Sequence, residues 1–255
     1  MPARDSIGEA GFPPRLMRRI RITLAYDGGP FHGWQVQPGL ATIQGTLEEI
    51  VSGMEGKPVH VAGSGRTDAG VHALQQVAAF SLENPIPLPN LRRAMNRLLP
   101  PAIRVCSVAE VDAAFHPRFD AKAKTYEYRI ARGEVCGPFD WPFVHHYPYP
   151  LEEDRMARLA GVFEGEHDFS TFAASDDRDA EGQSRVRTIF SSALARDQDR
   201  LIYRVRGSGF LKHMVRNLVG TLIEAGRGNI ADSRFPLKSG ATAPAKGLFL
   251  VGVEY

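Results

Sequence analysis

Hydrophobic residues alternate with polar ones in some stretches of the chain and recur at helical spacing in others. The stretch 19–26, RIRITLAY, carries apolar side chains on alternate positions, which is typical of a half-buried strand. The stretch 43–54 instead places them three and four residues apart, which predicts an amphipathic helix with Thr42 as its N-cap. By the same criteria we expect strands at 59–62, 74–82, 103–111, 125–130, 185–194, 201–207 and 248–253, and helices at 151–164 and 210–225.

One more helix and two loops complete the pattern. Asn90 is a suitable cap for a helix that Pro100 and Pro101 stop. Residues 137–150 are rich in proline and aromatic side chains and should form a long loop. Residues 173–183 are polar and acidic, so we expect a surface loop there as well.

Strands and helices are interspersed in both halves of the chain, and several strands follow one another directly. Such an order favours antiparallel or mixed strand pairing over a fully wound parallel sheet. We therefore predict an α+β fold with two similar α/β halves side by side, built on mostly antiparallel mixed sheets flanked by helices. The pattern breaks at 115–118, so the expected divisions are a flexible N-terminal extension at 1–17, an N-terminal domain at 18–114 and a C-terminal domain at 115–255.

Composition narrows the class of protein without naming a partner. Of the 255 residues, 43% are hydrophobic and 24% are charged, as in ordinary globular domains. The formal net charge is +2, which excludes a strongly acidic protein but does not establish nucleic-acid binding. Cys106 and Cys136 lie far apart, so we expect neither a disulfide framework nor a cysteine zinc site, and a reducing cytoplasm fits. With no run of about 18 apolar residues and no signal-peptide pattern, we expect no membrane span.

Residues 63–73, GSGRTDAGVHA, are the most unusual stretch. Three glycines and two alanines leave little side-chain bulk there, so a ligand could approach the backbone closely. Arg66 and Asp68 stand among these small residues as one cation and one carboxylate, which indicates an open site. From composition alone, a plain glycine-rich turn remains the alternative. A nucleotide-binding loop is not indicated, because the stretch lacks the Gly-Lys-Ser/Thr ending of a phosphate-binding loop.

The string GRTDAGVHA closely resembles the catalytic loop of the TruA-type family of tRNA pseudouridine synthases. Similarity runs from about Arg19 to Tyr255, and further blocks resemble the family in the same order: LAYDGGPFHGWQVQP, TIQGTLEE, FHPRFDAKAKTYEYRI, HDFSTF, FLKHMVRNLVGTLIEAGRG and TAPAKGLFLVGVEY. Several long blocks in order are a specific signal. One departure lies between Gly228 and Thr242, where the chain is shorter than the family usually is.

The resemblance implies the pseudouridine synthase fold, with a catalytic cleft between the two halves. It implies an isomerase that turns uridine into pseudouridine at positions 38, 39 and 40 of the tRNA anticodon arm. It further implies a homodimer that needs neither a metal ion nor a cofactor, and the histidines indeed show no HExxH or Cys/His ligand spacing. By resemblance Asp68 is the catalytic nucleophile, Tyr126 is the active-site tyrosine, and Arg216 points into the cleft.

Several roles remain open at the level of sequence. Asp68 could attack C1′ of the ribose or abstract a ribose proton. We expect Arg66 to pair with Asp68 and aim it, with a phosphate contact as the alternative. Tyr126 could stack on the detached uracil while its hydroxyl assists proton removal at C5, with core packing as the alternative. Tyr128 has the same parity on its strand and should face the same side. Arg216 could pair with Asp68 or lie on a solvated helix face.

The RNA itself sets the remaining expectations. A uridine inside a stem must be flipped out at a cost on the order of a few kcal/mol, which phosphate contacts can offset. Basic residues that could make such contacts form four clusters: Arg18, Arg19 and Arg21; Arg92 and Arg93; Arg118, Lys122 and Lys124; Arg204, Arg206 and Lys212.

Two other functions compete with the isomerase. A tRNA-binding protein or chaperone without catalysis would have no need of Asp68 and Tyr126. A carboxylate hydrolase acting on a sugar-like substrate usually needs two cooperating carboxylates, and only one stands out in the glycine-rich stretch.

Overall fold

The secondary structure alternates between strands and helices in both halves, as the sequence predicts. The computed structural model describes residues 17–174, 184–230, 235 and 237–255. Its strands are β1 (Arg18–Tyr26), β2 (Ala62–Gly63), β3 (His72–Leu82), β4 (Ile103–Val111), β5 (Ala123–Ala131), β6 (His145–His146), β7 (Gly165–Asp168), β8 (Val186–Asp197), β9 (Arg200–Gly207) and β10 (Leu248–Glu254). Its helices are α1 (Ile43–Glu55), α2 (Leu88–Leu98), α3 (Glu153–Val162) and α4 (Met214–Gly226), with short 3-10 helices η1 (Trp141–Phe143), η2 (Ser170–Phe172) and η4 (Ala245–Gly247).

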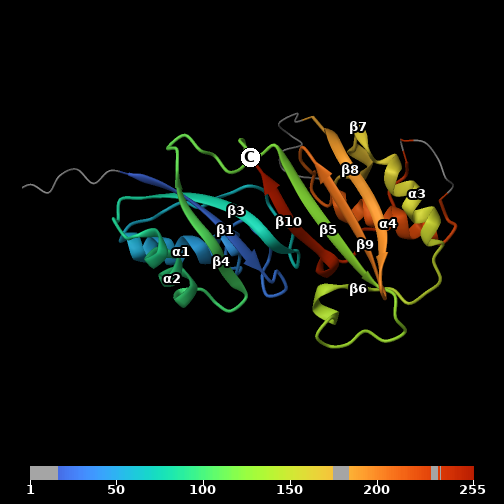
Figure 1. The fold of residues 1–255 in the computed structure, drawn as a ribbon, viewed down its shortest axis with the longest axis horizontal. Coiled ribbons are helices and arrows are strands. Elements are labelled where there is room, and N and C mark those ends of the chain that lie inside the picture. The colour runs from blue at the N-terminus through green and yellow to red at the C-terminus, as the bar shows by residue number, and fades with distance from the viewer. Residues whose placement is uncertain (1–16, 175–183, 231–234, 236) are drawn as a thin grey trace, which may run out of the picture.

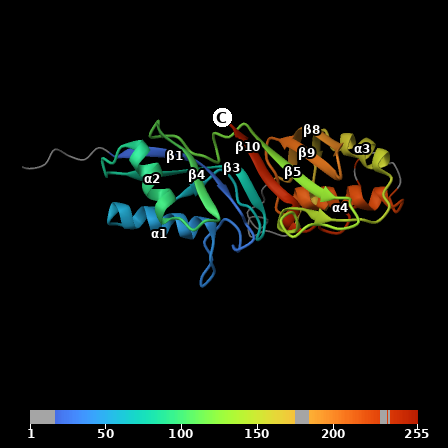
Figure 2. The ribbon, with the colours of Figure 1, turned by 60° about the horizontal axis from the view of Figure 1, so that its bottom comes forward.

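One mixed sheet runs along the molecule (Figure 1). In the described residues its strand order is β4-β1-β3-β10-β5-β9-β8-β7, with β2 beside β3 and β6 beside β5. Helices α1 and α2 lie at the end formed by β1 and β4, whereas α3 and α4 lie at the end formed by β8 and β9 (Figures 1 and 2). The described strand pairs are antiparallel except β10 with β3 and β5 with β6. The predicted α+β class with mostly antiparallel mixed pairing is confirmed.

Strand β10 joins the two halves of the molecule. It pairs in parallel with β3 through Phe249 beside His72 and Leu250 beside Ala73, and it pairs antiparallel with β5 on its other side. The halves therefore share one continuous sheet, which local periodicity cannot show because the pairing joins distant segments. The division at 114/115 falls in the connection between β4 and β5 and stays a prediction.

Helix boundaries show where local chemistry overrides the hydrophobic pattern. The cap of α1 is confirmed, because Thr42 Oγ1 accepts a hydrogen bond from Gly45 N at 3.2 Å. Helix α2 begins at Leu88 rather than after Asn90, since proline fits the first turn, where backbone N–H groups have no partner within the helix. Helix α4 begins at Met214 rather than near 210, because His213 takes a left-handed conformation with φ of 62°.

Three further differences concern short strands. The strand expected at 59–62 is reduced to Ala62–Gly63. The expected loop at 137–150 contains η1 and the short strand β6. Strand β7, with the sequence GEHD, has no apolar alternation that could predict it. It lies at the edge of the sheet, where polar side chains meet solvent.

The predicted apolar stripes form the core. Ile20, Ile22 and Leu24 on β1 are fully buried and alternate with half-buried neighbours. They belong to the same cluster as Leu47 and Val51 on the inner face of α1. Burial of each such side chain stabilises the fold by roughly 1.5–3 kcal/mol. The alternation in β1 and the helical spacing in α1 therefore both place apolar side chains in this one core.

Some expectations fall outside the described residues. These are most of the N-terminal extension, at 1–16, most of the surface loop, at 175–183, and part of the shortened connection, at 231–234 and 236. Within the described chain, every helix is too short or too polar to traverse a lipid bilayer.

Helix α4 packs unusually closely against the segment that precedes η4. A Cβ atom on Gly220 would lie 1.7 Å from the carbonyl oxygen of Ala241, so only glycine permits this approach. Thr221 Oγ1 accepts a hydrogen bond from Gly240 N at 2.8 Å, and Arg216 Nε donates to Ala243 O at 2.7 Å. The close packing therefore fixes the position of α4 and of the arginine that it carries.

The Gly220→Ala variant should be destabilised. The added methyl group would clash with the backbone of Ala241, which cannot move aside as a side chain can. We therefore expect the free energy of unfolding to fall by about 1–3 kcal/mol. Gly53→Ala is the matched control, because Gly53 is a helical glycine in α1 with open space around its Cβ. It should gain about 0.5–1 kcal/mol. Denaturant unfolding measures both variants, and unchanged stability of Gly220→Ala would contradict the packing argument.

Candidate active site

A cleft with a volume of about 1060 Å³ lies between the two halves. Its walls include residues 60–63 and 65–69 from the N-terminal half and residues 208–216 from the C-terminal half. Among the described residues that line it, Asp68 is the one carboxylate, whereas seven Lys and Arg residues contribute: Arg66, Arg118, Lys124, Arg185, Arg187, Lys212 and Arg216. A groove lined by one sign of charge concentrates ligands of the opposite sign. The cleft is therefore suited to a polyanion.

Asp68 lies in the cleft with its side chain 25% exposed. Its Oδ2 atom accepts a hydrogen bond from an Arg216 terminal nitrogen at 3.3 Å, and His213 Nε2 lies 3.6 Å from the same oxygen. Within the described residues, the Oδ1 atom has no hydrogen-bond or ion-pair partner. Two side chains thus hold one oxygen of the carboxylate, and the other oxygen remains available to a substrate.

The start of α4 positions both partners of Asp68. His213 precedes the helix with φ of 62°, a conformation that side chains other than Gly, Asn and Asp rarely adopt. Arg216 follows three residues later in the first turn of α4, and both side chains lie beside Asp68 Oδ2. Its Nε donates to Ala243 O at 2.7 Å, so the guanidinium is fixed at both ends. Strained backbone of this kind is frequent at functional sites.

The loop 63–71, here called the Asp68 loop, is held by the loop at 27–33. Gly33 has φ of 87°, and a Cβ atom there would lie 2.6 Å from Thr67 O. Next to it, Trp34 N donates to Thr67 O at 3.0 Å. The hydroxyl groups of Thr67 and Tyr26 lie 2.9 Å apart in the core. The glycine-rich character of both loops therefore allows two backbones to pack directly together.

Two polar side chains hold the other end of the Asp68 loop. Gln76 is fully buried on β3; its Nε2 donates to Gly65 O at 3.0 Å, and its Oε1 accepts from Ser64 Oγ at 2.6 Å. Lys124 reaches across from β5, and its Nζ donates to Ser64 O at 2.5 Å. These contacts fix the loop to strands of both halves.

Tyr126 lines the cleft from β5 with its residue only 7% exposed. Its ring meets Phe210 edge to face, with centroids 5.0 Å apart. Burial raises the pKa of the Tyr126 hydroxyl well above its ordinary value, and the nearby Tyr26 and Asp68 add to the rise. Tyr128 is fully buried, and its hydroxyl donates to Pro244 O at 2.8 Å. Tyr128 is not among the described residues that line the cleft. It shares the strand parity of Tyr126, but its side chain packs in the core.

Arg66 is exposed and lines the cleft, but it does not pair with Asp68. The expected Arg66–Asp68 pair is not found among the described contacts, where Asp68 Oδ2 lies beside Arg216 and His213 instead. Arg216 does pair with Asp68, as the sequence analysis allowed.

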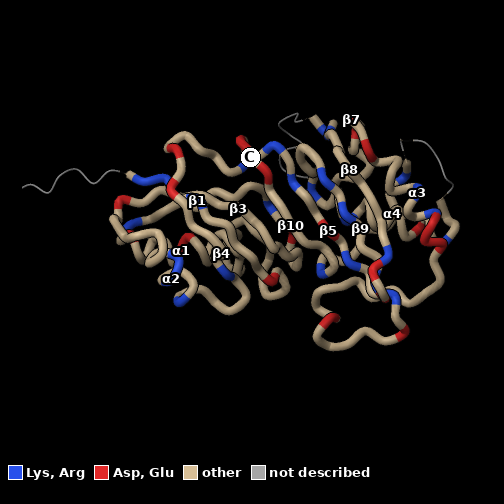
Figure 3. The backbone as a smooth tube through the Cα atoms, viewed as in Figure 1, with Lys and Arg blue, Asp and Glu red and all other residues tan. Residues whose placement is uncertain are grey.

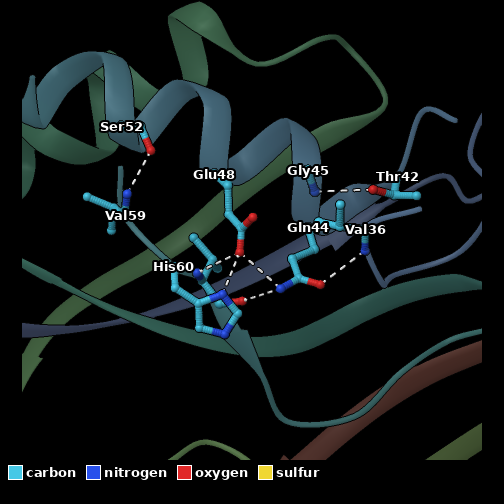
Figure 4. Close-up of polar contacts among 9 residues, drawn as sticks. Val36, Thr42, Gln44, Gly45, Glu48, Ser52, Val59 and His60 are labelled. Carbon is cyan, nitrogen blue, oxygen red and sulfur yellow. Dashed lines mark hydrogen bonds and ion pairs between the residues drawn. The ribbon is translucent and has the colours of Figure 1, made fainter. Parts of the chain in front are cut away.

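Glu48 and Gln44 on helix α1 hold part of the N-terminal wall of the cleft through polar contacts (Figure 4). Glu48 Oε1 accepts hydrogen bonds from Val61 N and from Gln44 Nε2, both at 3.0 Å, and lies 2.8 Å from His60 Nδ1. Gln44 Oε1 accepts from Val36 N at 3.2 Å. The two side chains lie one helical turn apart and together bind two separate segments of the cleft wall.

Some of the predicted basic residues line the cleft, and others form ion pairs with acidic residues. Lys and Arg recur along β5, β8 and β9 (Figure 3). Of the predicted clusters, Arg118, Lys124 and Lys212 line the cleft. Others pair with acids: Arg18 with Glu110, Arg204 with Glu127, and Arg206 with Glu254. Arg185 and Arg187 line the cleft although the sequence analysis did not single them out.

Three residues hold the Asp68 loop or its carboxylate in ways that the sequence did not predict. His213 stands three residues before Arg216 in FLKHMVRN, but its left-handed backbone, which precedes the helix, has no signal in the sequence. Lys124 appears only as a member of a basic cluster, and its contact with the Asp68 loop depends on distant strand pairing. Gln76 gives no local signal, because a polar residue within a strand usually faces solvent. In the described part of the chain, no group of three His, Cys, Asp or Glu side chains could hold a metal ion.

Comparison with known proteins shows the family of this chain. A relative from Solibacter usitatus named tRNA pseudouridine synthase A is 80% identical over 94% of this chain and 100% of its own length. Relatives of the same name from Limosilactobacillus fermentum and Brevibacillus brevis are 44% and 42% identical over 94% of this chain, and 96% and 100% of their own lengths. A family model described as tRNA pseudouridine synthase matches residues 22–120 and 159–255. The chain therefore belongs to the tRNA pseudouridine synthase family.

Proposed function

We propose that this protein converts uridine to pseudouridine in the anticodon stem-loop of tRNA, at positions 38, 39 and 40, with Asp68 as the nucleophile. The family's activity is pseudouridine formation in tRNA, which is an isomerisation. One observation carries the finer proposal: Asp68 is the one carboxylate among the described lining residues of a cationic cleft, and one of its oxygens has no protein partner.

The chemistry needs a group that holds the nucleoside while its base turns. In the proposed reaction Asp68 Oδ1 bonds to C1′ as the C1′–N1 bond breaks. The detached uracil rotates, C5 bonds to C1′ as the carboxylate leaves, C5 loses its proton and N1 gains one. No electron is gained or lost overall. The alternative, in which Asp68 abstracts a ribose proton, uses the same open oxygen.

Arg216 and His213 act as positioning groups in this proposal. Both lie beside Oδ2, so the carboxylate can rotate little and Oδ1 keeps its direction into the cleft. Holding a nucleophile in its reactive geometry lowers the barrier by reducing the entropy lost during reaction. Arg216 is itself fixed to Ala243 O, so its guanidinium serves as a rigid support.

Tyr126 is proposed as the stacking surface for the target uracil. Its ring lines the same cleft as Asp68 and is mostly buried there. Burial raises the pKa of the phenol further above neutral pH, so its deprotonated form is even scarcer than in an ordinary tyrosine, which favours stacking over proton abstraction from C5.

The exposed cations are proposed to hold the RNA backbone. Arg66 has no contact with Asp68 and lies at the cleft surface, so we assign it to a phosphate. Such contacts can offset the cost of extruding the uridine. A cytoplasmic homodimer, in which one subunit grips the tRNA body while the other presents its cleft, completes the proposal.

Replacing Asp68 with Asn should abolish catalysis and preserve binding. Asn has nearly the same shape but cannot act as the nucleophile, so tritium release from transcripts that carry 5-tritiated uridine should stop. The affinity for tRNA, measured by filter binding, should stay within a few-fold of the parent, roughly 1 kcal/mol. If the protein only bound tRNA, the unsubstituted protein would also release no tritium. Full release by the variant would exclude Asp68 as the nucleophile.

Binding should weaken steeply with salt. If about five of the cations contact phosphates, the Kd should rise on the order of 100-fold between 50 and 200 mM salt. Arg66→Ala should weaken binding and reduce the slope of log K against log salt by about one. Arg97→Ala is the matched control, because Arg97 is exposed on α2 and is not among the described lining residues. A salt response that is flat, or unchanged by Arg66→Ala, would contradict the phosphate role.

A further inference from the structure

Phe119 is an exposed aromatic side chain at the cleft. It is 75% exposed and lines the cavity. The other aromatic rings of the described lining, apart from histidines, belong to Trp34, Tyr126 and Phe210, which are buried or half-buried. We infer that Phe119 stacks on a second unpaired base of the RNA, while the target uridine occupies the deeper site at Asp68 and Tyr126. This inference rests on the proposed function and names a further substrate contact.

The backbone that carries Phe119 is held firmly. His116 Nδ1 accepts hydrogen bonds from Arg118 N at 3.1 Å and from Phe119 N at 3.3 Å. Asp120 closes the turn, because its Oδ2 accepts from His116 N at 2.9 Å and its own N–H donates to His116 O at 3.1 Å. A turn bonded in this way presents its side chain with little loss of freedom on binding, which favours affinity.

The C-terminus fixes the same turn from outside. Tyr255 Oη donates to Pro117 O at 2.8 Å, and the Tyr255 ring lies 5.1 Å from that of Phe115. The connection between β4 and β5 accordingly runs beside the C-terminus (Figure 1). The exposure of Phe119 is therefore a feature of a rigid turn and not of a loose loop.

The surroundings of Phe119 suit a base and its phosphate. The Arg118 guanidinium lies 5.5 Å from the centre of the Phe119 ring, and the His116 ring lies 4.3 Å from it at a tilt of 32°. Arg118 also lines the cleft, together with the other six cations. Exposed aromatic rings beside cations are the usual platform for single-stranded nucleic acid, because every base has a face that can stack.

The position of Phe119 separates its role from that of Tyr126. Tyr126 is buried at 7% exposure, whereas Phe119 is open to solvent in the same cavity. One base cannot both fill the buried site and cover the exposed ring. The base that stacks on Phe119 is therefore a different nucleotide from the target uridine.

The test uses binding of an unmodified tRNA transcript in the Asp68→Asn background, where no uridine is converted. Phe119→Ala should raise the Kd by about 5- to 150-fold, the usual effect of losing one stacked base. Because no charge is removed, the slope of log K against log salt should stay unchanged. Phe119→Trp keeps an aromatic ring and should bind with the affinity of the parent. The fluorescence of the introduced Trp should be quenched when the transcript binds. Phe119→Leu, apolar but not aromatic, should remain weak.

Phe139→Ala is the matched control, because Phe139 is 91% exposed and is not among the described lining residues. Its Kd should equal that of the parent, and thermal unfolding should show all variants folded. Parental affinity of Phe119→Ala, restoration by Leu, or unquenched fluorescence of Phe119→Trp would each overturn the inference. If the parent protein forms no pseudouridine, the proposed function fails, whatever the Phe119 variants show in binding.

Discussion

The ion pair between Asp68 and Arg216 connects the two halves of the molecule across the cleft. Asp68 comes from a loop that ends at β3, and Arg216 comes from the first turn of α4. Strand β10 sets their separation, because it pairs with β3 at the point where the Asp68 loop ends. Close packing at Gly220 then fixes α4. The reactive geometry is thus a consequence of long-range packing.

The cleft combines two kinds of surface, one cationic and one aromatic. Its cations provide an attraction that acts on any RNA backbone, and they cannot by themselves select a nucleotide. Its aromatic rings differ in burial, with Tyr126 deep and Phe119 open. The family assignment explains why both surfaces occur together, since a base must leave its stack before its glycosidic bond can be remade.

Local patterns in the sequence predicted more of the elements than of the contacts. Alternation and helical spacing located β1, β4 and α1, because each follows from burial of one face in a common core. The unusual composition of residues 63–73 located Asp68, and resemblance supplied Tyr126 and Arg216. The continuous sheet and the Lys124–Ser64 contact depend on segments that are distant in sequence. The left-handed His213 was missed, because residues of its type rarely adopt that conformation.

The central claim is that this cleft remakes the glycosidic bond of an extruded uridine in the anticodon arm. It is tested most directly by mapping pseudouridine, by mass spectrometry of nuclease fragments, in unmodified tRNA transcripts incubated with the protein. The account predicts new pseudouridine at positions 38, 39 or 40 and unmodified uridine elsewhere in the same molecules. Transcripts that carry uridine at these positions and leave the reaction unchanged, or that are modified only in another arm, would contradict it.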